Sequence, residues 1–391
     1  MERYQYVIIG GGMTGDAAVE GIREIDKENS ILLVSAETNP PYDRPPLTKG
    51  LWKEKSVADI WRGTKDKNID LKLNTRIVEI NSVDKYVTDS EGNTFSYVNL
   101  LIASGGTPRK LPFGGDLINY YRTLEDYRKL SAKTEEAENF AVIGSGFIGS
   151  EISAGLSMND KKVVLFDVGP GIAWKVFPDN VVDYLNNYYK KRNVRLVTKT
   201  VLKDVVSEDG GFSILTKNGD EYSAEFVLAG IGIKPNVELG ESIGLKVDNG
   251  IHVDEHLRTT DPAIYAAGDV ANFYNPLLME RIRIEHEDNA NAMGKQAGRN
   301  MAGAGEVYDY LPMFYSDLFD VGYEAVGILD SRFQIVQDWQ EEFKKGLLYY
   351  LNNDRLRGVL LWNVWDQLDH AREMLALEAP VKEKDLIGKI N

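Results

Sequence analysis

The sequence predicts an α/β protein with two Rossmann-like dinucleotide-binding domains, because one pattern occurs twice along the chain. In each copy a short apolar strand runs into a glycine turn with the spacing G-x-G-x-x-G, and a helical pattern and another apolar strand follow. The first copy opens with "YVIIGGGMTG" and the second with "FAVIGSGFIG". Such a repeat implies either two bound dinucleotides or a duplication in which one copy has decayed, and neither copy lacks an element.

Composition limits the class of protein. A chain of 391 residues with 43% hydrophobic content is expected to form two or three domains of roughly 150 residues each. The net charge of −15 argues against nucleic acid or an anionic membrane as the main partner. The chain contains no cysteine, which excludes disulfides, thiolate metal sites and a CxxC redox pair, and no metal site is predicted. The chain shows no leader-like start and no apolar run of membrane-spanning length, so we expect a cytoplasmic protein.

The first copy has every part that a dinucleotide site requires. Tyr6 to Ile9 is a β-branched run typical of a buried parallel strand, "DAAVEGIREI" has helical spacing, and "SILLVSAE" is an apolar strand that ends at Glu37. The first glycine of the turn allows the tight bend, the second lets a pyrophosphate approach, and the third lets helix and strand pack closely. These glycines are Gly10, Gly12 and Gly15.

The second copy repeats this order. "FAVIG" is the strand, "SEISAGLSM" opens the helix, and "KKVVLFD" is a strand that ends at Asp167. The turn glycines are Gly144, Gly146 and Gly149. An acidic residue at the end of this strand can accept both ribose hydroxyls of an adenosine and would repel a 2′-phosphate, so the pattern favours NADH over NADPH.

Further segments extend the predicted fold. "IYAAGDV" is an apolar strand that ends in Gly268-Asp269, where a carboxylate would suit a ribityl hydroxyl, although an Asp in an ordinary loop is the other interpretation. "LLIASGGTPR" and "VLAGIGIKPN" are strands that close the two nucleotide units. Near the end, two apolar runs joined by Asn352-Asn353-Asp354 predict a hairpin, and "QLDHAREML" predicts a helix.

With these segments the sequence resembles the FAD-dependent pyridine nucleotide–disulfide reductase superfamily. Within it, the chain is most similar to the branch of ferredoxin and rubredoxin reductases and apoptosis-inducing-factor-like NADH oxidoreductases. The resemblance is carried by the glycine turns and by "PPYDRPPLTKGLW", "YYRTLED", "RIEHEDNANAMGKQAG" and "MFYSDLFDVGYEAVG". It implies two glutathione-reductase-type domains and a C-terminal α+β interface domain: an FAD-binding domain over 1–111 and 240–311, an NAD-binding domain over 112–239, and an interface domain over 312–391.

The resemblance implies an FAD site around the first turn. Lys49 would lie near flavin N5, where a positive charge stabilises negative charge that develops as hydride arrives, and it is the one residue given a catalytic role. The family's ribose-binding acid falls at Ala36, so either Glu37 takes that role through a shifted loop or the contact is lost. The other FAD-side positions carried over are Gly10, Gly12, Met13, Thr14, Gly15, Arg44, Ile77, Ala103, Ser104, Arg122, Asp269, His286 and Glu287.

The resemblance likewise implies an NADH site around the second turn. Tyr315 stands where apoptosis-inducing-factor-like relatives commonly have tryptophan, and it keeps an aromatic face. Glu151 matches a position beside the nicotinamide, although an acid in the first turn of a helix is the alternative interpretation. The NADH-side positions are Gly144, Ser145, Gly146, Phe147, Ile148, Gly149, Glu151, Asp167, Lys175, Gly232, Glu285, Tyr315 and Glu324.

The implied activity is hydride transfer from NADH to FAD, followed by electron delivery to a ferredoxin or rubredoxin. The absence of cysteine excludes the disulfide relay of other superfamily members. Two alternatives stay open: an NADH oxidase that uses oxygen or a quinone, and a flavin-bearing binding protein that senses redox state. A homodimer is also left open. For docking of an acidic carrier, the candidate basic residues are Arg44, Lys49, Arg281 and Arg283.

Overall fold

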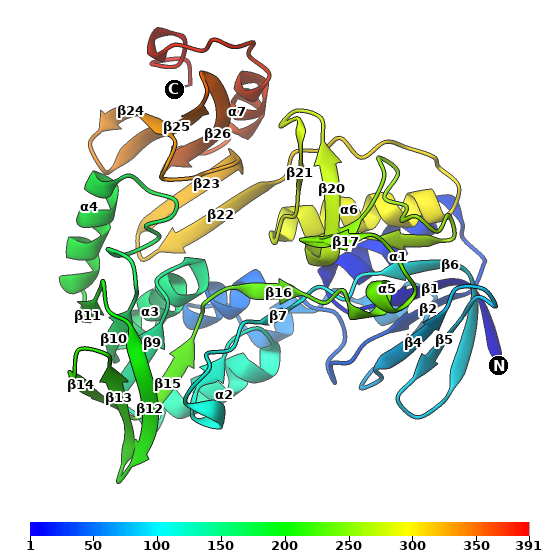
Figure 1. Ribbon diagram of the computed structural model, residues 1–391, viewed down its shortest axis with the longest axis horizontal. Coiled ribbons are helices and arrows are strands. Elements are labelled where there is room, and N and C mark those ends of the chain that lie inside the picture. The colour runs from blue at the N-terminus through cyan, green and yellow to red at the C-terminus, as the bar shows by residue number, and fades with distance from the viewer. Residues whose placement is uncertain (391) are drawn as a thin grey trace. The chain divides into compact units, whose positions relative to one another are not determined.

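The computed structural model describes residues 1–390, and the chain divides into two compact units (Figure 1). Unit 1 comprises Met1–Arg44, Val57–Thr107 and Lys234–Met313. Unit 2 comprises Pro45–Ser56, Pro108–Ile233 and the described residues from Phe314 onward. The chain leaves unit 1 within the short strand β7 (Gly106–Pro108) and returns to it within β16 (Ile233–Pro235).

The two units differ in two ways from the three predicted domains. Residues 45–56, which we assigned to the FAD-binding domain, cluster with unit 2, and residues 314–390 cluster with the segment that we assigned to NAD binding. The division into three functional domains therefore stays a prediction, whereas the two units describe which segments pack together.

A seven-stranded sheet forms the centre of unit 1. Val7 and Ile8 are fully buried because β1 has neighbours on both edges and both faces, as a continuous apolar run predicts. One end of β6 pairs antiparallel with β5, and its other end, Leu100–Ile102, pairs parallel with β19. The sheet order is β3-β2-β1-β6-β5-β4, with strands β1 (Glu2–Ile9), β2 (Ile31–Val34), β3 (Asp70–Lys72), β4 (Ile77–Asn81), β5 (Tyr86–Asp89), β6 (Thr94–Ile102) and β19 (Ile264–Ala266).

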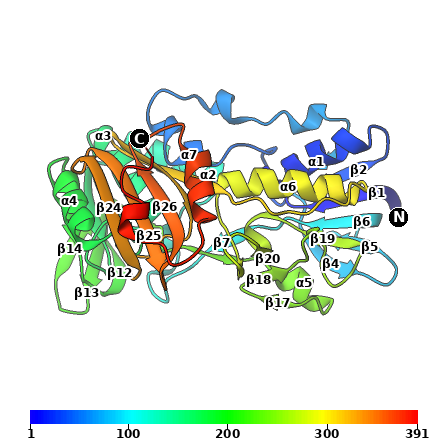
Figure 2. The ribbon, with the colours of Figure 1, turned by 90° about the horizontal axis from the view of Figure 1, so that it is seen from above.

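Two helices of unit 1 pack backbone to backbone. Helix α1 (Met13–Ile25) lies beside α6 (Glu287–Met301), as Figure 2 shows. A Cβ atom at Gly21 would lie 2.0 Å from the carbonyl oxygen of Lys295, and one at Gly298 would lie 2.1 Å from that of Ala18. Glycine on both helices therefore permits the close approach. As a result, helix α1, which follows the first glycine turn, packs against a segment far along the chain.

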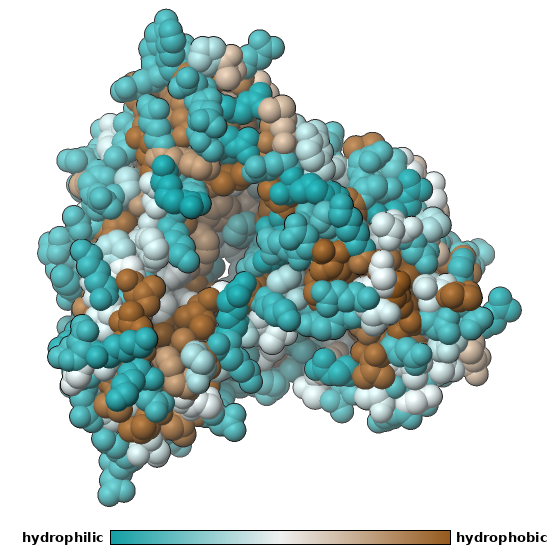
Figure 3. Space-filling model, viewed as in Figure 1, coloured by the Kyte–Doolittle hydropathy of each residue, from teal (hydrophilic) through white to brown (hydrophobic). Residues whose placement is uncertain are grey.

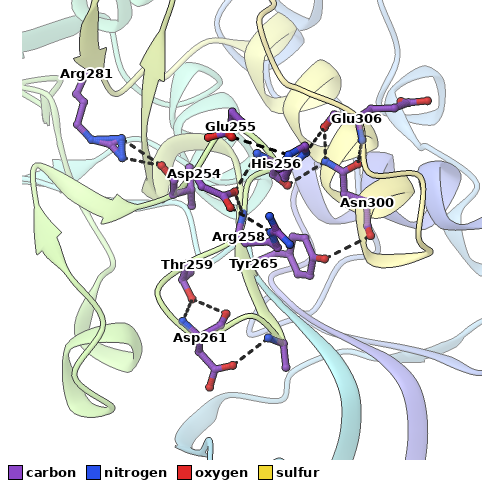
Figure 4. A network of polar contacts seen from close by, with 12 residues as sticks. Asp254, Glu255, His256, Arg258, Thr259, Asp261, Tyr265, Arg281, Asn300 and Glu306 are labelled. Carbon is purple, nitrogen blue, oxygen red and sulfur yellow. Dashed lines mark hydrogen bonds and ion pairs between the residues drawn. The ribbon is translucent and has the colours of Figure 1, made fainter.

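A polar network supports strand β19 in unit 1 (Figure 4). The Asp254 carboxylate accepts hydrogen bonds from the backbone N–H of His256 and of Arg258, at 2.9 and 2.8 Å. The Tyr265 hydroxyl on β19 donates to the carbonyl of Asn300 at the end of α6. Strand β19 is thus held by the loop before it and by α6. The strands of a four-stranded sheet flank β19 in sequence: β17 (Val247–Asp248) and β18 (Gly250–His252) precede it, and β20 (Ala271–Asn275) and β21 (Glu280–Ile282) follow it.

Unit 2 contains a five-stranded parallel sheet in the order β11-β10-β9-β15-β8. A three-stranded antiparallel meander, β12-β13-β14, accompanies it. The elements of this part are β8 (Asn119–Tyr120), α2 (Leu124–Thr134), β9 (Asn139–Ile143), α3 (Phe147–Met158), β10 (Lys162–Phe166), α4 (Asp179–Lys190), β11 (Val194–Val197), β12 (Leu202–Glu208), β13 (Gly211–Thr216), β14 (Glu221–Ala224) and β15 (Phe226–Ala229). The short helix α5 (Glu238–Ser242) belongs to unit 1.

The C-terminal part of unit 2 is a five-stranded sheet in the order β22-β23-β26-β25-β24, in which the pairs β23–β26, β26–β25 and β25–β24 are antiparallel. The predicted hairpin is confirmed: β25 and β26 are joined at Asn353 and Asp354, whose φ angles are 51° and 56°. The predicted helix is confirmed as α7 (Leu368–Leu375). The strands are β22 (Met313–Leu318), β23 (Val321–Gly327), β24 (Gln334–Glu341), β25 (Lys345–Asn352) and β26 (Arg355–Trp362).

On the face drawn in Figure 3, hydrophobic residues show as separate patches among polar ones. Among residues 1–390, no helix is both long and apolar enough to cross a membrane.

Candidate functional site

The first glycine turn joins β1 to α1 at the carboxyl end of the sheet. Gly10 has φ of 124°, and a Cβ atom there would lie 2.1 Å from the carbonyl oxygen of Ala103. A Cβ atom at Gly15 would lie 2.1 Å from the carbonyl oxygen of Gly10. The middle glycine differs, because a Cβ atom at Gly12 would have no neighbour closer than Arg44 Nη2 at 3.9 Å. The first and third glycines are thus required by the fold, and the second leaves space in front of the helix.

The second turn, between β9 and α3, repeats this arrangement. A Cβ atom at Gly144 would lie 2.5 Å from the carbonyl oxygen of Gly230, and one at Gly149 would lie 1.8 Å from that of Gly144. A Cβ atom at Gly146 would have no neighbour within 4 Å. Both turns therefore fit a group that approaches the backbone at the middle glycine, where free N–H groups and the helix dipole favour a pyrophosphate.

Glu37 lies beside the first turn. Its carboxylate pairs with Arg44 at 2.5 Å and accepts a hydrogen bond from the Tyr42 hydroxyl at 2.7 Å. Burial alone would lower the pKa of Arg44, but its interactions with Tyr42, Glu37 and Asp269 raise this pKa, so the guanidinium stays charged. Because the Arg44 guanidinium also faces Gly12, Glu37 lies within the surroundings of the turn, which favours the shifted-loop interpretation.

The remaining FAD-side residues near the sheet edge come from three strands. Ala103 follows β6, and its N–H donates to the carbonyl of Ile9 at 2.8 Å. Ser104 and Asn236 exchange two hydrogen bonds of 2.8 Å, so the side chain of Ser104 is tied to the returning chain. Asp269 follows β19 and therefore reaches the same edge as Gly10. Ile77 starts β4, where it is 6% exposed, and Met13 and Thr14 open α1.

The segment before α6 contains the predicted His286 and Glu287. His286 is the N-cap of α6, and Glu287 is its first residue. The helix therefore begins one residue before Asp288, near which we expected its start. Arg283 donates to the carbonyl of Asp269 at 3.0 Å and pairs with Glu285 at 2.6 Å. The Arg283 side chain is only 7% exposed, so it supports the Asp269 turn from within.

The suggestion of an exposed basic docking patch is wrong for three of its four residues. Arg283 is buried, Arg44 is paired with Glu37, and the side chain of Lys49 is 12% exposed and paired with Glu151. Only Arg281 is exposed, and its guanidinium donates to the Val253 carbonyl at 2.6 and 3.1 Å. These arginines and the lysine serve internal contacts, because each one faces a carboxylate or a carbonyl inside its own unit.

Unit 2 contains a buried group that we call the Glu151 cluster, defined as Thr48, Lys49, Glu151, Tyr315 and Ser316. Glu151 is 3% exposed, and its carboxylate accepts from Thr48 Oγ1 at 2.5 Å, Lys49 Nζ at 2.8 Å and Ser316 Oγ at 2.6 Å. The Lys49 ammonium lies 5.1 Å from the ring centroid of Tyr315, within cation–π range. The structure thus joins the predicted Lys49, Glu151 and Tyr315.

The loop that carries Lys49 is anchored on α3. The Trp52 indole donates to the Leu47 carbonyl at 2.8 Å, and the Tyr121 hydroxyl donates to the same carbonyl at 2.6 Å. A Cβ atom at Gly155 would lie 3.0 Å from Trp52, so the glycine admits the indole ring. These contacts place Lys49 with α3 rather than with the sheet of unit 1.

The alternative interpretation of Glu151 as an acid in the first turn of a helix is wrong. We expected the helix to start near Ser150, but α3 starts at Phe147 and has no acid in its first turn. The helix starts earlier because Gly146 already has an extended N-cap conformation. Glu151 therefore points its carboxylate at a cation and two hydroxyls. Phe147 packs edge-on against Phe314 at 5.6 Å, and Ile148 is 38% exposed.

Asp167 follows β10 and contacts the second glycine turn. Its carboxylate accepts from the N–H and the hydroxyl of Ser145, from the N–H of Gly169 and from the Trp174 indole. Lys175 is exposed, with its ammonium 5.5 Å from a ring centroid of Trp174. The structure thus brings Asp167 to the second turn and adds an indole that the sequence analysis did not consider.

Three predicted residues lie outside these groups. Arg122 precedes the capping box of α2, and its N–H donates to Asp126. Gly232 has φ of 91°, and its carbonyl accepts from the N–H of Arg109. Glu324 lies on β23, where Oε2 is buried with no hydrogen-bond partner among the described residues. Burial and the charge of Asp366 raise the pKa of Glu324, partly offset by Arg372. The structure does not place Glu324 in the Glu151 cluster.

Sequence reasoning missed Thr48, Ser316 and Trp174. Each of these residues adjoins a residue that we did predict: Thr48 precedes Lys49, Ser316 follows Tyr315, and Trp174 precedes Lys175. Their roles depend on which hydroxyl or indole points at a buried carboxylate, and that is a property of side-chain direction rather than of a motif. Within residues 1–390 there is no group of acidic, histidine or cysteine side chains arranged to hold a metal ion.

Two glycine turns of one design, each at the carboxyl ends of parallel strands, define the class of dinucleotide-binding oxidoreductases. Residues 4–294 match the family model described as pyridine nucleotide-disulphide oxidoreductase, and residues 297–340 and 335–377 match the model for the C-terminal region of apoptosis-inducing factor. The chain belongs to the pyridine nucleotide-disulphide oxidoreductase family. It is an FAD-dependent reductase that uses NAD(H), as the resemblance implied.

Individual relatives cover almost the whole chain. Apoptosis-inducing factor 1 of Dictyostelium discoideum is 34% identical over 98% of this chain and 80% of its own length. The ferredoxin–NAD(+) reductase component of the anthranilate 1,2-dioxygenase system of Burkholderia cepacia is 33% identical over 83% of this chain and 82% of its own. Putidaredoxin reductase, in the crystal structure of its covalent complex with putidaredoxin, superposes with a TM-score of 0.89 at 29% identity and covers 98% of this chain and 95% of its own.

Proposed function

We propose that the protein oxidises NADH and delivers the electrons singly to a ferredoxin- or rubredoxin-type iron–sulfur protein. One observation carries this proposal: the chain has two complete dinucleotide turns and no cysteine. Electrons that reach the flavin therefore cannot leave through a disulfide relay. The names of two relatives support a protein carrier, because one is a ferredoxin–NAD(+) reductase and another is seen in complex with putidaredoxin.

In this proposal the first turn holds FAD and the second holds NADH. Gly12, with the N-terminus of α1, would hold one pyrophosphate, and Gly146, with that of α3, the other. Arg44, Glu37 and Asp269 would bind the phosphates and hydroxyls of FAD. When bound, FAD accepts two electrons as hydride from NADH and releases them one at a time, so it connects a two-electron donor to a one-electron carrier.

The Glu151 cluster would orient charge at the place of hydride transfer. Lys49 brings a positive charge, and Glu151 fixes its position from a nearly dry site. Tyr315 offers an aromatic face to the same ammonium. Because none of these side chains needs to exchange a proton for hydride to move, the contribution of the protein is positioning and electrostatics.

The experiment is a comparison of acceptors with the purified, FAD-loaded protein. NADH oxidation is followed with a [2Fe–2S] ferredoxin, a rubredoxin, a quinone and oxygen, each over a range of concentrations. The proposal expects turnover with at least one iron–sulfur protein to exceed turnover with oxygen by tenfold or more. Fast turnover only with oxygen or the quinone would overturn it in favour of an NADH oxidase.

A second candidate is favoured by one specific observation, the match of residues 297–340 and 335–377 to the C-terminal model of apoptosis-inducing factor. A relative of that kind would react slowly with every acceptor and would act as a flavin-bearing binding protein or a slow oxidase. Poor turnover with all four acceptors, together with a long-lived complex between the reduced protein and NAD⁺, would support this second candidate.

A further inference from the structure

The carboxylate of Asp167 is surrounded by donors from the protein itself. Oδ2 accepts from the Ser145 N–H at 2.7 Å and from the Ser145 hydroxyl at 2.8 Å. Oδ1 accepts from the Gly169 N–H at 2.6 Å and from the Trp174 indole N–H at 3.0 Å. An ionised carboxylate offers about four lone-pair sites. Three N–H groups and the Ser145 hydroxyl lie against these sites, and the single proton of the hydroxyl is shared with the Gly171 carbonyl at 2.7 Å, so a protein group already occupies each site.

This saturation conflicts with the role that the proposed function gives to Asp167. An adenosine ribose would donate up to two hydroxyl hydrogen bonds to this carboxylate. Since its acceptor sites are already in use, a ribose hydroxyl can bind only where an internal donor leaves. The free energy needed to release that donor lowers the affinity of the site for NADH.

The four donors differ in how easily they can leave. Ser145 is fully buried, and its carbonyl accepts from the Ala173 N–H at 2.8 Å, so both of its donors are fixed in the glycine turn. The Gly169 N–H is part of a tight backbone turn, and its carbonyl accepts from Lys199. The Trp174 indole is a side chain on a partly exposed residue, and its hydrogen bond is the longest of the four.

We propose that Trp174 is an affinity- and specificity-determining residue of the adenosine subsite, because its indole N–H occupies the acceptor site of Asp167 that a ribose hydroxyl must take. This inference rests on the proposed assignment of the second glycine turn to NADH. The indole packs directly on Gly169, where a Cβ atom would lie 2.1 Å from Trp174 Nε1. The N–H therefore stands in for the ribose hydroxyl until the nucleotide displaces it.

The exchange distinguishes two nucleotides. A ribose 2′-hydroxyl is a donor and can replace the indole N–H at Oδ1. A 2′-phosphorylated ribose keeps only its 3′-hydroxyl as a donor and brings negative charge to a carboxylate, so it gains less when the indole leaves. Removal of the indole N–H should therefore help a nucleotide with a free 2′-hydroxyl more than its 2′-phosphorylated form.

The test uses ADP-ribose, which contains the adenosine half of NADH and cannot reduce the flavin. Its affinity for the FAD-loaded protein is measured by calorimetry for the unchanged chain and for Trp174→Phe, which keeps a ring but lacks the N–H. We expect Trp174→Phe to lower the Kd of ADP-ribose by threefold to tenfold, because the apparent affinity rises as the competing state is removed. An unchanged or weaker affinity would overturn the inference.

Two controls are matched to this variant. Trp365→Phe removes an exposed indole of unit 2 and should leave the Kd of ADP-ribose unchanged. With 2′-phospho-ADP-ribose as the probe, Trp174→Phe should give a smaller gain in affinity than with ADP-ribose. An equal gain for both probes would mean that the variant only creates space, and it would overturn the competition between N–H and hydroxyl.

A measurement on the unchanged chain keeps the inference testable if Trp174→Phe folds poorly. With ¹⁵N-labelled tryptophan, the Trp174 indole N–H signal is assigned by its loss in Trp174→Phe or Trp174→Tyr. Saturating ADP-ribose should shift this signal toward the position of an indole without a charged acceptor. A signal that does not move while ADP-ribose binds would overturn the inference.

The variant Asp167→Asn separates a failure of this inference from a failure of the proposed function. If Asp167→Asn weakens ADP-ribose binding and Trp174→Phe does not strengthen it, the NADH site stands and the role of Trp174 falls. If no form of the protein binds ADP-ribose, the assignment of the second turn to NADH is what fails, and the inference falls with it.

Discussion

Lys49 Nζ lies 2.8 Å from Oε2 of Glu151, and the two residues come from segments about 100 positions apart in sequence. Neither side chain is well exposed, with 12% for Lys49 and 3% for Glu151. A buried pair of this kind is costly to break, because the remaining charge keeps its desolvation penalty without a partner. The pair therefore provides a sharp test of the proposed hydride-transfer site.

Glu151→Gln should slow the reduction of bound flavin by NADH at least tenfold in stopped-flow experiments, because Lys49 loses the charge that fixes its position. Breaking the pair should also lower the free energy of unfolding by roughly 3 kcal/mol. Lys53→Gln, which removes an exposed lysine of the same loop, is the control and should change neither quantity. An unchanged rate of flavin reduction in Glu151→Gln would remove the cluster from the proposed site.

Ser316→Ala should lower the free energy of unfolding by about 1–3 kcal/mol, because it removes a hydrogen bond to a buried carboxylate. The measurement is denaturant unfolding followed by tryptophan fluorescence. Ser207→Ala changes an exposed serine of unit 2 and should stay within about 0.5 kcal/mol of the unchanged chain. Equal effects of the two substitutions would contradict the hydrogen bond between Ser316 and Glu151.

Glu37→Gln tests the shifted-loop interpretation of the first turn. Glu37 lies with Arg44 beside Gly12, so we expect the variant to lose FAD more readily than the unchanged chain during dialysis. The readout is the ratio of flavin absorbance to protein absorbance. Glu28→Gln alters an exposed acid of the same unit and should retain FAD normally. If Glu37→Gln retains FAD as well as this control does, the ribose contact is lost in this chain.

The unchanged protein should use NADH about tenfold to a hundredfold more efficiently than NADPH in kcat/KM. A 2′-phosphate near Asp167 sets like charges close together, and the corresponding cost is about 1–3 kcal/mol. Asp167→Ala should narrow this ratio, mainly by raising KM for NADH. Steady-state kinetics with both donors measures the effect, and equal efficiency of the two donors in the unchanged protein would refute the expected preference.

His252 should make the fold less stable as the pH falls below about 6.5. Burial, together with the charges of Arg281 and Lys246, lowers the pKa of His252 from its ordinary value of 6.5, although Asp248 acts in the opposite direction. The unfolded state then binds a proton before the folded state does, so stability is complete above pH 6.5 and decreases as the pH falls through the lowered pKa. The geometry agrees, because Arg281 donates to Nδ1 of His252 at 3.4 Å and protonation would remove that acceptor.

The measurement is the free energy of unfolding between pH 7 and pH 5 for the unchanged chain and for His252→Asn. The variant should lose less stability across this window. His370→Asn, at an exposed position on α7, should follow the unchanged chain. If His252→Asn and the unchanged chain lose stability in parallel, another group is responsible for the pH dependence.

The backbone of both nucleotide turns could be predicted from sequence because its requirements are local. Gly10 and Gly144 need positive φ angles, and Gly15 and Gly149 cannot carry a side chain against a carbonyl, so the motif follows from sterics. The hairpin at Asn353 and Asp354 was predictable for the same reason. In each case a few adjacent residues determine the structure.

The polar contacts of the site could not be predicted in this way. Thr48 and Ser316 donate to the Glu151 carboxylate from distant parts of the sequence. The side chain of Arg283 is buried, although a charged residue in that position would be expected at the surface. Such contacts depend on where segments far apart in the chain meet. Family resemblance supplied Lys49 and Glu151 as separate positions, and only the fold shows that they bind each other.

The glycine contacts between α1 and α6 also bear on how this protein is made in the cell. The first glycine turn is synthesised early. However, helix α1, which follows the turn, packs against Gly294 and Gly298 of α6, and strand β19 completes the sheet that contains β1. At ribosomal rates of about 5–20 residues per second, the nascent α1 waits for roughly tens of seconds before its partner helix exists. The parallel sheet of unit 2 is continuous between Asn119 and Ala229, so it can form during that wait. We therefore expect the first nucleotide turn to reach its final packing late in biosynthesis, after the second nucleotide turn has already been built.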